Sequence, residues 1–275
     1  MPKNIDFSVI IVNYRSHALL REALVSFARA HAHCPYTFEF IIVDSASGPE
    51  ELAALDHTLS QSHLPVPLRY RALETNRGFA AANNSAATDA AGRYFLFLNP
   101  DTVCHQDILS ALAPLLARAD TGAVSPVLRL PDGRLQPAAF GALPTPFGII
   151  AHKFFRLRGQ LHIASRQSVD WVSGACLAVS AAHFSQVHGF DSHFFMYFED
   201  VDLCARLLAA GYRNYVLSNI SIVHLGGARP RLTRARRAAY FAAQDRFLHK
   251  CGYKLGLFRL VRAPYRLICY LKDAP

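Results

Sequence analysis

The chain has 275 residues, of which 52% are hydrophobic, and it carries a formal net charge of +9. It is long enough to bury a sizeable core in one large α/β domain or two small ones, and we expect one domain with a C-terminal appendage. No secretory leader is indicated at the N-terminus, and the longest stretch without charged side chains, 171–190, is too polar to span a bilayer. We therefore expect a cytoplasmic protein. Six scattered cysteines without a C-x-x-C pair indicate reduced thiols rather than disulfides or a zinc site.

Strand-like apolar runs alternate with helical patterns over the first hundred residues. The strand-like runs are FSVIIVNY, FEFIIVD, LRYRAL and RYFLFLN, and the helical patterns fall at 16–31, 49–60 and 77–91. This rhythm is typical of βαβ units around a buried parallel sheet.

Polar residues stand where these predicted strands end, which is where ligands bind in parallel sheets. They are Asn13, Asp44, Asn76, Asn99 and Asp101. Taken singly, each is explained equally well by the preference of Asn and Asp for turns and helix caps, and Asn76 precedes a predicted helix that it would cap.

The pattern changes between residues 121 and 180. The run VSPVLRLPDGRLQPAAF places Asp132-Gly133 between apolar segments, which predicts a hairpin. Residues 141–168 are rich in Pro, Gly and basic residues and have little periodicity, so we expect a long loop over a substrate. The segment DWVSGACLAVS then predicts a further strand.

Three carboxylates follow an apolar run in FFMYFEDVDLCARLLAAGYR, residues 194–213. If 199–210 is a helix, Asp200 shares its face with the apolar positions Leu203, Cys204, Leu207 and Leu208 and points toward the core. Glu199 and Asp202 then lie on the flank, where Asp202 pairs with Arg206 at the surface. A carboxylate on an apolar stripe is a candidate general base if it borders a cleft, and a helix cap is the alternative that these residues leave open.

Seven segments in one order give a more specific signal. They are SVIIVNYR, IIVDSASG, NRGFAAANN, FLFLNPDT, WVSGACLAVS, GFDSHFFMYFEDVDLCARLLAAGYR and IVHLGG, and they cover most of residues 7–227. Together they resemble the inverting family 2 glycosyltransferases, which move a sugar from a nucleotide donor to an acceptor hydroxyl. The resemblance implies the GT-A fold, with a mostly parallel central sheet flanked by helices, over residues 1–228.

The resemblance also implies a divalent metal, Mg²⁺ or Mn²⁺, on the donor diphosphate. Asp101 of the NPD segment matches the last acid of the D-x-D metal motif, and Asn99 stands where the motif has its first acid. An amide oxygen still suits these cations, although one negative charge is lost. His224 matches a further metal ligand of some relatives, and Gly226 and Gly227 allow backbone amides to approach the diphosphate.

The remaining matched positions imply donor, acceptor and catalytic roles. On the donor side, Asp44 matches the acid that recognises the nucleoside, with Asn13 and Tyr14 beside it, and Asn76 and Gly78 belong to a matched donor segment. The VDSASG sequence departs from the usual pattern after that acid, which leaves the base open. Asp200 matches the general base, and Trp171, Gly174 and Glu199 lie in stretches that line the acceptor side.

The C-terminal residues 229–275 contain 12 basic and two acidic side chains, whereas residues 1–228 contain 17 basic and 18 acidic ones. We expect a basic helical extension in which 233–250 packs on the domain and Pro264 bends or breaks a second helix. Arg229, Arg231 or Arg234 are candidates for a donor or lipid diphosphate. The distal part, with Arg259, Arg262 and Arg266 on one face, resembles a segment that rests on anionic lipid. Nucleic acid is disfavoured because no recognised binding module is present.

Among family members, the chain looks most like bacterial rhamnosyltransferases that build surface polysaccharide on a polyprenyl-diphosphate carrier. This implies dTDP-rhamnose as the donor and a glycan or lipid-diphosphate-linked acceptor. The alternatives are a UDP-sugar-dependent transferase and a non-catalytic nucleotide-sugar-binding module of the same fold. A dehydrogenase is disfavoured because no G-x-G-x-x-G follows the first strand.

Overall fold

The structure is a computed structural model that describes residues 5–62, 64–155, 166–228 and 233–271. Its first half alternates strands and helices as the apolar pattern predicted. The strands are β1 (Phe7–Asn13), β2 (Phe38–Asp44), β3 (Leu68–Ala72) and β4 (Tyr94–Leu98), and the helices are α1 (His17–Ala30), α2 (Pro49–Gln61) and α3 (Gly78–Ala87). All the pairings among these four strands are parallel.

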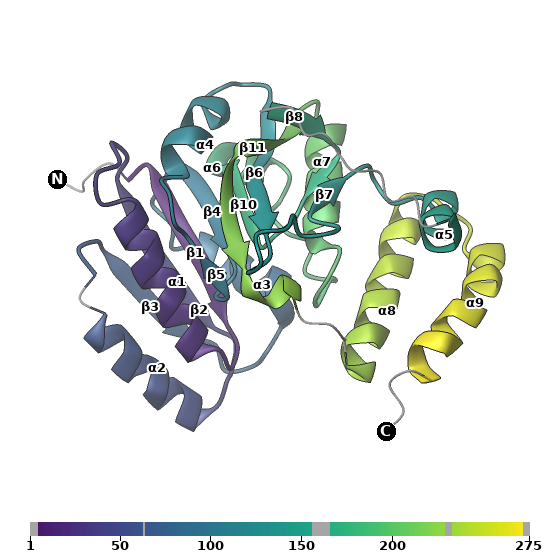
Figure 1. Cartoon of the computed structure of the whole chain (residues 1–275), viewed down its shortest axis with the longest axis horizontal. Helices are drawn as coiled ribbons and strands as arrows, with labels where there is room; N and C mark the ends of the chain where they lie inside the picture. Colours follow the sequence, from purple (N-terminus) through teal and green to yellow (C-terminus); the bar gives the residue numbers. More distant parts are fainter. Residues whose placement is uncertain (1–4, 63, 156–165, 229–232, 272–275) are drawn as a thin grey trace.

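Strands β1, β2 and β4 are buried on both faces, whereas β3 is partly exposed. Alternate side chains of β1 enter two different cores. Val9 and Ile11 pack in a cluster with α1, α2 and α4 (Leu109–Leu116), whereas Ile10 and Val12 pack with α3 and α7 (Glu199–Ala209) on the other face. This is the expected result of a two-residue side-chain period in a sheet covered by helices on both sides. Figure 1 shows α1 and α2 together on one face of the sheet.

The second half of the chain completes a mixed sheet. Its strands are β5 (Thr102–Val103), β6 (Thr121–Arg129), β7 (Phe140–Gly141), β8 (Arg166–Val169), β9 (Trp171–Val172), β10 (Cys176–Ser180) and β11 (Arg213–His224). The strand order is β3-β2-β1-β4-β10-β6-β11-β5, with β8 also on β11 and with β7 and β9 as a separate pair. Because β10 is antiparallel to both its neighbours, the sheet is parallel only in its first half and between β6 and β11.

The helices of the second half are α4 (Leu109–Leu116), α5 (Pro146–Phe155), α6 (Ala181–Gln186), α7 (Glu199–Ala209), α8 (Arg234–Lys250) and α9 (Gly256–Leu271). Helix α5 corrects the prediction of a loop over 141–168, of which 156–165 lie outside the described residues. Its sequence, PFGIIAHKFF, is short and begins at a proline, so a Pro- and Gly-rich composition concealed it.

Two local predictions have different outcomes. The Asp132-Gly133 turn is confirmed, because Arg129 and Leu135 form an antiparallel bridge and Gly133 has a φ of 81°. The single strand expected over DWVSGACLAVS is wrong, since β9 and β10 are separated by residues 173–175. That interruption exposes a backbone N–H which the candidate site uses.

The C-terminal helices α8 and α9 lie beside α5, on the side of the molecule away from α1 and α2 (Figure 1). They pack through Phe247, Leu248 and Phe258 against Phe194 and Phe198, which precede α7, and against Val201 in its first turn. The extension is therefore part of a continuous apolar core. No helix in the described part of the chain is long and apolar enough to cross a membrane.

Helix α9 differs from the sequence expectation in two ways. It continues through Pro264 rather than ending there. Arg262, one of the three basic residues predicted to face lipid, is 2% exposed and contacts Gln244 and, at 2.6 Å, Asp245 of α8. Arg259 contacts the same Asp245 at 3.0 Å, so part of this basic face holds the two helices together.

Candidate active site

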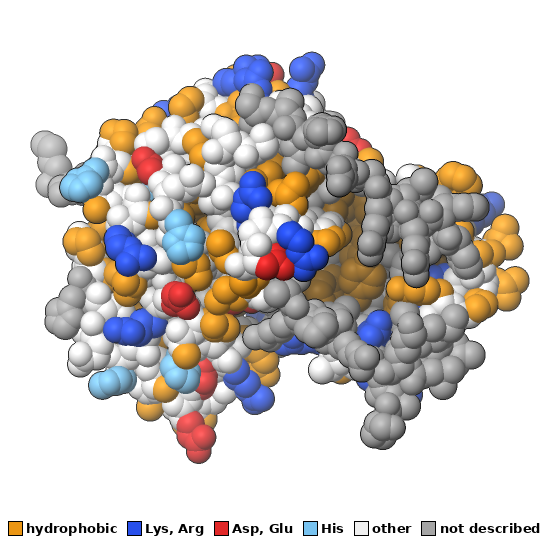
Figure 2. Space-filling model, in the orientation of Figure 1, with side chains coloured by type: hydrophobic (Ala, Val, Ile, Leu, Met, Phe, Trp, Pro, Cys, Tyr) orange, Lys and Arg blue, Asp and Glu red, His pale blue; other side chains and the backbone are white. Residues whose placement is uncertain are grey.

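A cavity of about 490 Å³ lies between the end of the central sheet, α7 and α8. Figure 2 shows the hollow between the main body and the C-terminal helices, with hydrophobic side chains at its wall. Predicted site residues meet there from separate parts of the chain, and they are Asn99, Trp171, Gly174, Glu199, Asp200 and His224. Met196, Tyr197 and Phe198, from the apolar run before the carboxylates, also line the cavity.

Asp101 and His224 come together at the sheet end of the site. The short strand β5, which follows Asp101, pairs with β11 so that Thr102 lies opposite His224. This register places His224 Nε2 3.2 Å from Asp101 Oδ1, and Asn99 Nδ2 lies 3.3 Å from the same ring nitrogen. The carboxylate, imidazole and amide therefore converge, as the family resemblance implied.

Gln136 was not predicted and fixes the orientation of the His224 ring. It lies on the return limb of the Asp132-Gly133 hairpin, and its Oε1 is 2.8 Å from His224 Nδ1. Because an amide oxygen can only accept, Nδ1 donates to Gln136, and the ring is turned so that Nε2 faces Asp101 and Asn99. Such outer contacts are the usual way to orient a metal-binding histidine.

The residues at this end fit a divalent cation. A carboxylate, an imidazole and an amide are side chains that Mg²⁺ or Mn²⁺ accepts as ligands, and here Asp101 Oδ1 and Asn99 Nδ2 lie 3.2 and 3.3 Å from His224 Nε2. Gly226 leaves room for the carboxylate, since a Cβ there would lie 2.1 Å from Asp101 Oδ2. Within the described ranges no three His, Cys, Asp or Glu side chains form a cluster, so donor phosphates and water would complete the coordination.

The strand-end residues Asn13 and Asp44 form a buried network rather than an open surface. Both are 0% exposed, and Asp44 accepts hydrogen bonds from Asn13 Nδ2, Ser47 N and Ser47 Oγ at 2.6–2.9 Å. The network fixes the turn that follows β2. A direct nucleoside contact by Asp44 stays a prediction, and Tyr14, which is 44% exposed, presents a ring at the same edge of the sheet.

Asn76 and Gly78 contribute to the start of α3. Asn76 Oδ1 accepts from the Gly78 backbone N–H at 2.9 Å, which forms a turn just before α3, whereas the N-cap itself is Arg77. Gly78 has a φ of 86°, and a Cβ at this position would lie 2.2 Å from the backbone oxygen of Phe195. Its close neighbour in the structure is thus the loop before α7, and a donor contact by either residue stays a prediction.

Asp200 stands at the first turn of α7, and the interruption between β9 and β10 holds its carboxylate. Its Oδ2 accepts from the Gly174 N–H at 2.8 Å, and its Oδ1 accepts from the Val201 N–H at 2.8 Å. Tyr197 and Phe198, the two residues just before α7, both have positive φ values, 69° and 65°. Left-handed conformations in aromatic residues are strained, and strain of this kind concentrates at functional sites.

Glu199 is buried, which corrects its predicted place on the flank of the helix. It is 7% exposed, and its Oε2 has no hydrogen-bond partner among the described residues. Desolvation, followed by the charge of Asp200, raises the pKa of Glu199 well above its ordinary value. Desolvation also raises the pKa of Asp200, although the Gly174 and Val201 N–H groups oppose it. A carboxylate kept basic inside a cavity is suited to general-base chemistry.

Asp202 is also buried, at 2% exposure, so the prediction that its pair with Arg206 lies at the surface is wrong. The pair itself is present at 2.8 Å, and Lys250 of α8 binds the other carboxylate oxygen at 2.6 Å. Lys250 also contacts Asp191 at 2.7 Å. Asp202 thus has a cationic partner on each of its carboxylate oxygens. The group therefore joins α8 to the helix that carries Asp200.

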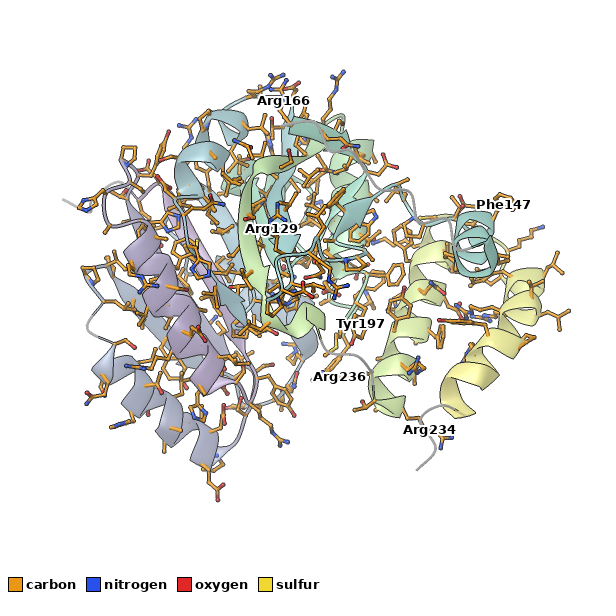
Figure 3. All side chains as sticks on the ribbon, in the orientation of Figure 1. Arg129, Phe147, Arg166, Tyr197, Arg234 and Arg236 are labelled. Carbon is orange, nitrogen blue, oxygen red and sulfur yellow. The ribbon has the colours of Figure 1, made fainter. Side chains whose placement is uncertain are left out.

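Trp171 lines the cavity and anchors the loop before α5. Its indole N–H donates to the Ala142 backbone oxygen at 3.1 Å, so the ring is held at the wall in a half-buried position. The candidate phosphate ligands Arg229 and Arg231 lie outside the described residues, and Arg234 is exposed in the first turn of α8. Figure 3 labels Arg234 and Arg236 near the start of that helix.

The sheet, the acid and histidine at its end and the buried acid pair of α7 define a sugar-transferring enzyme of the GT-A class. The chain belongs to glycosyl transferase family 2, whose model matches residues 8–202. Among solved structures it resembles the mannosyltransferase PcManGT of Pyrobaculum calidifontis, in complex with GDP-Man and Mn²⁺, with a TM-score of 0.59 and 20% identity over 86% of this chain and 61% of that one.

Two curated relatives are rhamnosyltransferases. The N-acetylglucosaminyl-diphospho-decaprenol L-rhamnosyltransferase of Mycobacterium tuberculosis is 32% identical over 142 residues, which are 48% of this chain and 46% of that protein. The rhamnosyltransferase WbbL of Escherichia coli is 29% identical over 159 residues, or 54% of this chain and 60% of that protein. The chain thus spans about half the length of these relatives. The predicted family and the resemblance to rhamnosyltransferases are confirmed.

Proposed function

We propose that this protein is a metal-dependent inverting glycosyltransferase that transfers L-rhamnose from dTDP-rhamnose to a glycan or polyprenyl-diphosphate-linked acceptor in surface-polysaccharide synthesis. One observation carries the proposal. A single cavity holds Asp200 and Glu199 on one wall and Asn99 and His224, next to Asp101, on another. The names of the two rhamnosyltransferase relatives support the choice of sugar.

In the proposed reaction Asp200 accepts the proton of the acceptor hydroxyl. The hydroxyl oxygen forms a bond to the anomeric carbon as the bond from that carbon to the diphosphate oxygen breaks on the opposite side, which inverts the configuration. The Gly174 N–H holds Asp200 Oδ2 in place, and burial keeps the carboxylate basic. A divalent cation bound by Asp101 and His224 would neutralise charge that accumulates on the leaving diphosphate.

The donor class is tested by thermal unfolding of the purified protein with dTDP, UDP, GDP or CDP, each with Mn²⁺, Mg²⁺ or EDTA. A ligand at a hundred times its dissociation constant adds about 2.7 kcal/mol to the free energy of unfolding. We expect a metal-dependent rise in melting temperature with dTDP. A rise with UDP alone would favour a UDP-sugar donor, and no rise with any nucleotide would contradict the proposal and favour a binding module for another ligand.

We also propose that the C-terminal helices contact anionic membrane. Phe147 of α5 is 80% exposed, and Leu257 and Leu260 of α9 are 74% and 71% exposed. Figure 2 shows hydrophobic side chains on the outer edge of this lobe, and Figure 3 labels Phe147 there. Exposed apolar side chains on a basic helix are typical of segments that rest on lipid.

The membrane contact is tested by co-sedimentation with vesicles that contain an anionic phospholipid. The double substitution Leu257→Ser and Leu260→Ser is expected to reduce vesicle binding several-fold, because it removes apolar area that lipid would bury. The matched control is Leu135→Ser, since Leu135 is also exposed, at 41%, but lies on the hairpin of β6. Equal binding by the double variant and the parent would show that α9 does not contact lipid.

A further inference from the structure

The catalytic cavity has a cationic side chain on the wall built by the C-terminal extension. Among the described residues that line the cavity, His224 and Arg236 are the two basic ones. His224 belongs to the sheet end, where it contacts Asp101 and Asn99. Arg236 comes from the first turn of α8. The two basic groups therefore stand on different walls, one supplied by the sheet and one by the helical extension.

The position of Arg236 is fixed by the surrounding structure. Its backbone N–H donates to Thr233 Oγ at 3.3 Å, which caps α8. At the other end of α8, Lys250 binds the buried Asp202 of α7 at 2.6 Å. The helix that carries Arg236 is thus attached to the helix that carries Asp200, and the exposed Arg236 side chain lines the same cavity as the proposed base.

Aromatic side chains line the cavity beside Arg236. Tyr197 and Tyr240 line the cavity with it, and Figure 3 labels Tyr197 and Arg236 close together at this edge. Burial raises the pKa of the Tyr197 phenol, and the positive charge of Arg236 opposes that rise, which places the guanidinium within electrostatic reach of the ring. No acidic side chain in the described ranges forms an ion pair with Arg236, so its donors are available to a ligand.

These features match a ligand with a sugar at one end, a charged middle and an apolar tail. A neutral acceptor sugar beside Asp200 requires no guanidinium, whereas a phosphate does, because Arg presents a planar set of N–H donors that fits phosphate oxygens. The first turn of α8 adds the positive end of a helix dipole. The aromatic side chains Phe198, Tyr197 and Tyr240 offer apolar surface next to this charge.

We propose that Arg236 binds the diphosphate of a lipid-linked acceptor and so places the acceptor sugar at Asp200. The inference rests on the proposed function and adds to it the acceptor class and the residue that recognises it. A nucleotide donor carries the same diphosphate chemistry, and the proposed function places that group at the other wall, beside Asn99, Asp101 and His224. Sequence reasoning considered the arginines at 229, 231 and 234 for a diphosphate and did not single out Arg236.

The test measures binding by titration calorimetry, so it does not depend on turnover. The two probes are N-acetylglucosamine linked to farnesol through a diphosphate and the same sugar joined to farnesol directly. We expect Arg236→Ala to weaken binding of the diphosphate probe about 10- to 100-fold, as loss of a charge-assisted contact does. Binding of the neutral probe should change less than about twofold. Arg236→Lys, which keeps the charge but not the planar donor set, should fall between the two.

Arg246→Ala is the matched control, because Arg246 lies on the same helix and is exposed outside the catalytic cavity. Its affinity for both probes should equal that of the parent. Equal affinity of Arg236→Ala and the parent for the diphosphate probe would overturn the inference, and so would an equal loss for both probes. If Arg236→Ala instead lost the Mn²⁺-dependent thermal shift with nucleoside diphosphate, Arg236 would belong to the donor site, which also overturns it.

Failure of the proposed function has a different signature. If the parent transferred no sugar from any nucleotide donor while Arg236→Ala still lost the diphosphate probe selectively, the diphosphate site would stand and the transferase assignment would fall. If transfer occurred and Arg236→Ala had the parent KM for the diphosphate-linked acceptor, the transferase assignment would stand and the role of Arg236 would fall.

Discussion

Replacing Asp200 with asparagine is expected to lower kcat for sugar transfer by about 10²- to 10⁴-fold, the range that general-base catalysis contributes. The amide oxygen can still accept from the Gly174 N–H, which Asp200 Oδ2 does at 2.8 Å, while the Val201 N–H loses the acceptor that Oδ1 provides. The amide has no basic oxygen to take the acceptor proton. Initial rates with saturating donor and acceptor measure the effect, and nucleotide-dependent thermal unfolding checks that donor binding is retained.

The matched control for this substitution is Asp132→Asn, since Asp132 lies in an exposed turn and pairs with Arg134. The parent enzyme adds a pH criterion. Because burial raises the pKa of Asp200, protonation removes the base at a pH above the ordinary aspartate range. The kcat/KM of the parent should therefore fall as the pH decreases through that raised pKa. An Asp200→Asn variant that turned over at the parent rate would show that another group is the base.

Replacing Asp101 with alanine is expected to abolish the Mn²⁺-dependent part of nucleotide binding. Asp101 supplies the only carboxylate next to His224 Nε2 in the described part of the chain, at 3.2 Å. Without it, the imidazole and the Asn99 amide are neutral ligands and bind a hard divalent cation weakly. The measurement is the melting temperature at fixed nucleoside diphosphate, once with Mn²⁺ and once with EDTA. In the parent, a ligand at a hundred times Kd adds about 2.7 kcal/mol to the free energy of unfolding. In Asp101→Ala the difference between the Mn²⁺ and EDTA samples should be near zero.

A second substitution keeps the Asp101 carboxylate but changes its position. In Gly226→Ala the new Cβ would lie 2.1 Å from Asp101 Oδ2, so the carboxylate has to turn away. This variant should lose most of the metal-dependent shift although every proposed ligand is retained. Gly256→Ala is its control, because nothing lies within 4 Å of a Cβ at that position. An Asp101→Ala variant with the parent Mn²⁺ response would place the metal elsewhere.

Periodicity predicted the first half of the fold because both faces of its sheet are buried. Runs such as FEFIIVD are almost continuously apolar, as expected of a strand that is buried on both faces, and β2 covers the whole of that run. The candidate site followed from the same reasoning, since parallel strands end at one edge and bring Asn99 and Asp101 to it. The pairing of β5 with β11 then adds His224.

The residues that were missed depend on contacts between distant segments. Gln136 reaches His224 only because a hairpin folds back along β6, and Arg236 enters the cavity only because α8 packs against the segment before α7. The spacing of Asp202 to Arg206 predicted a surface residue. In the structure Asp202 is buried and binds Lys250, which lies 48 positions later in the chain. Such pairings have no local sequence period, so helical and strand patterns do not reveal them.

The proposed transfer is tested most directly by mass spectrometry of a diphospholipid-linked sugar acceptor after incubation with the protein, Mn²⁺ and dTDP-rhamnose. We expect an acceptor lengthened by one deoxyhexose, formed in the presence of Mn²⁺ and lost both with EDTA and in the Asp200→Asn variant. An acceptor that stays unmodified with dTDP-rhamnose and with every other nucleotide sugar, while the nucleotides themselves bind, would contradict the proposed transfer and identify the cavity as a binding site without catalysis.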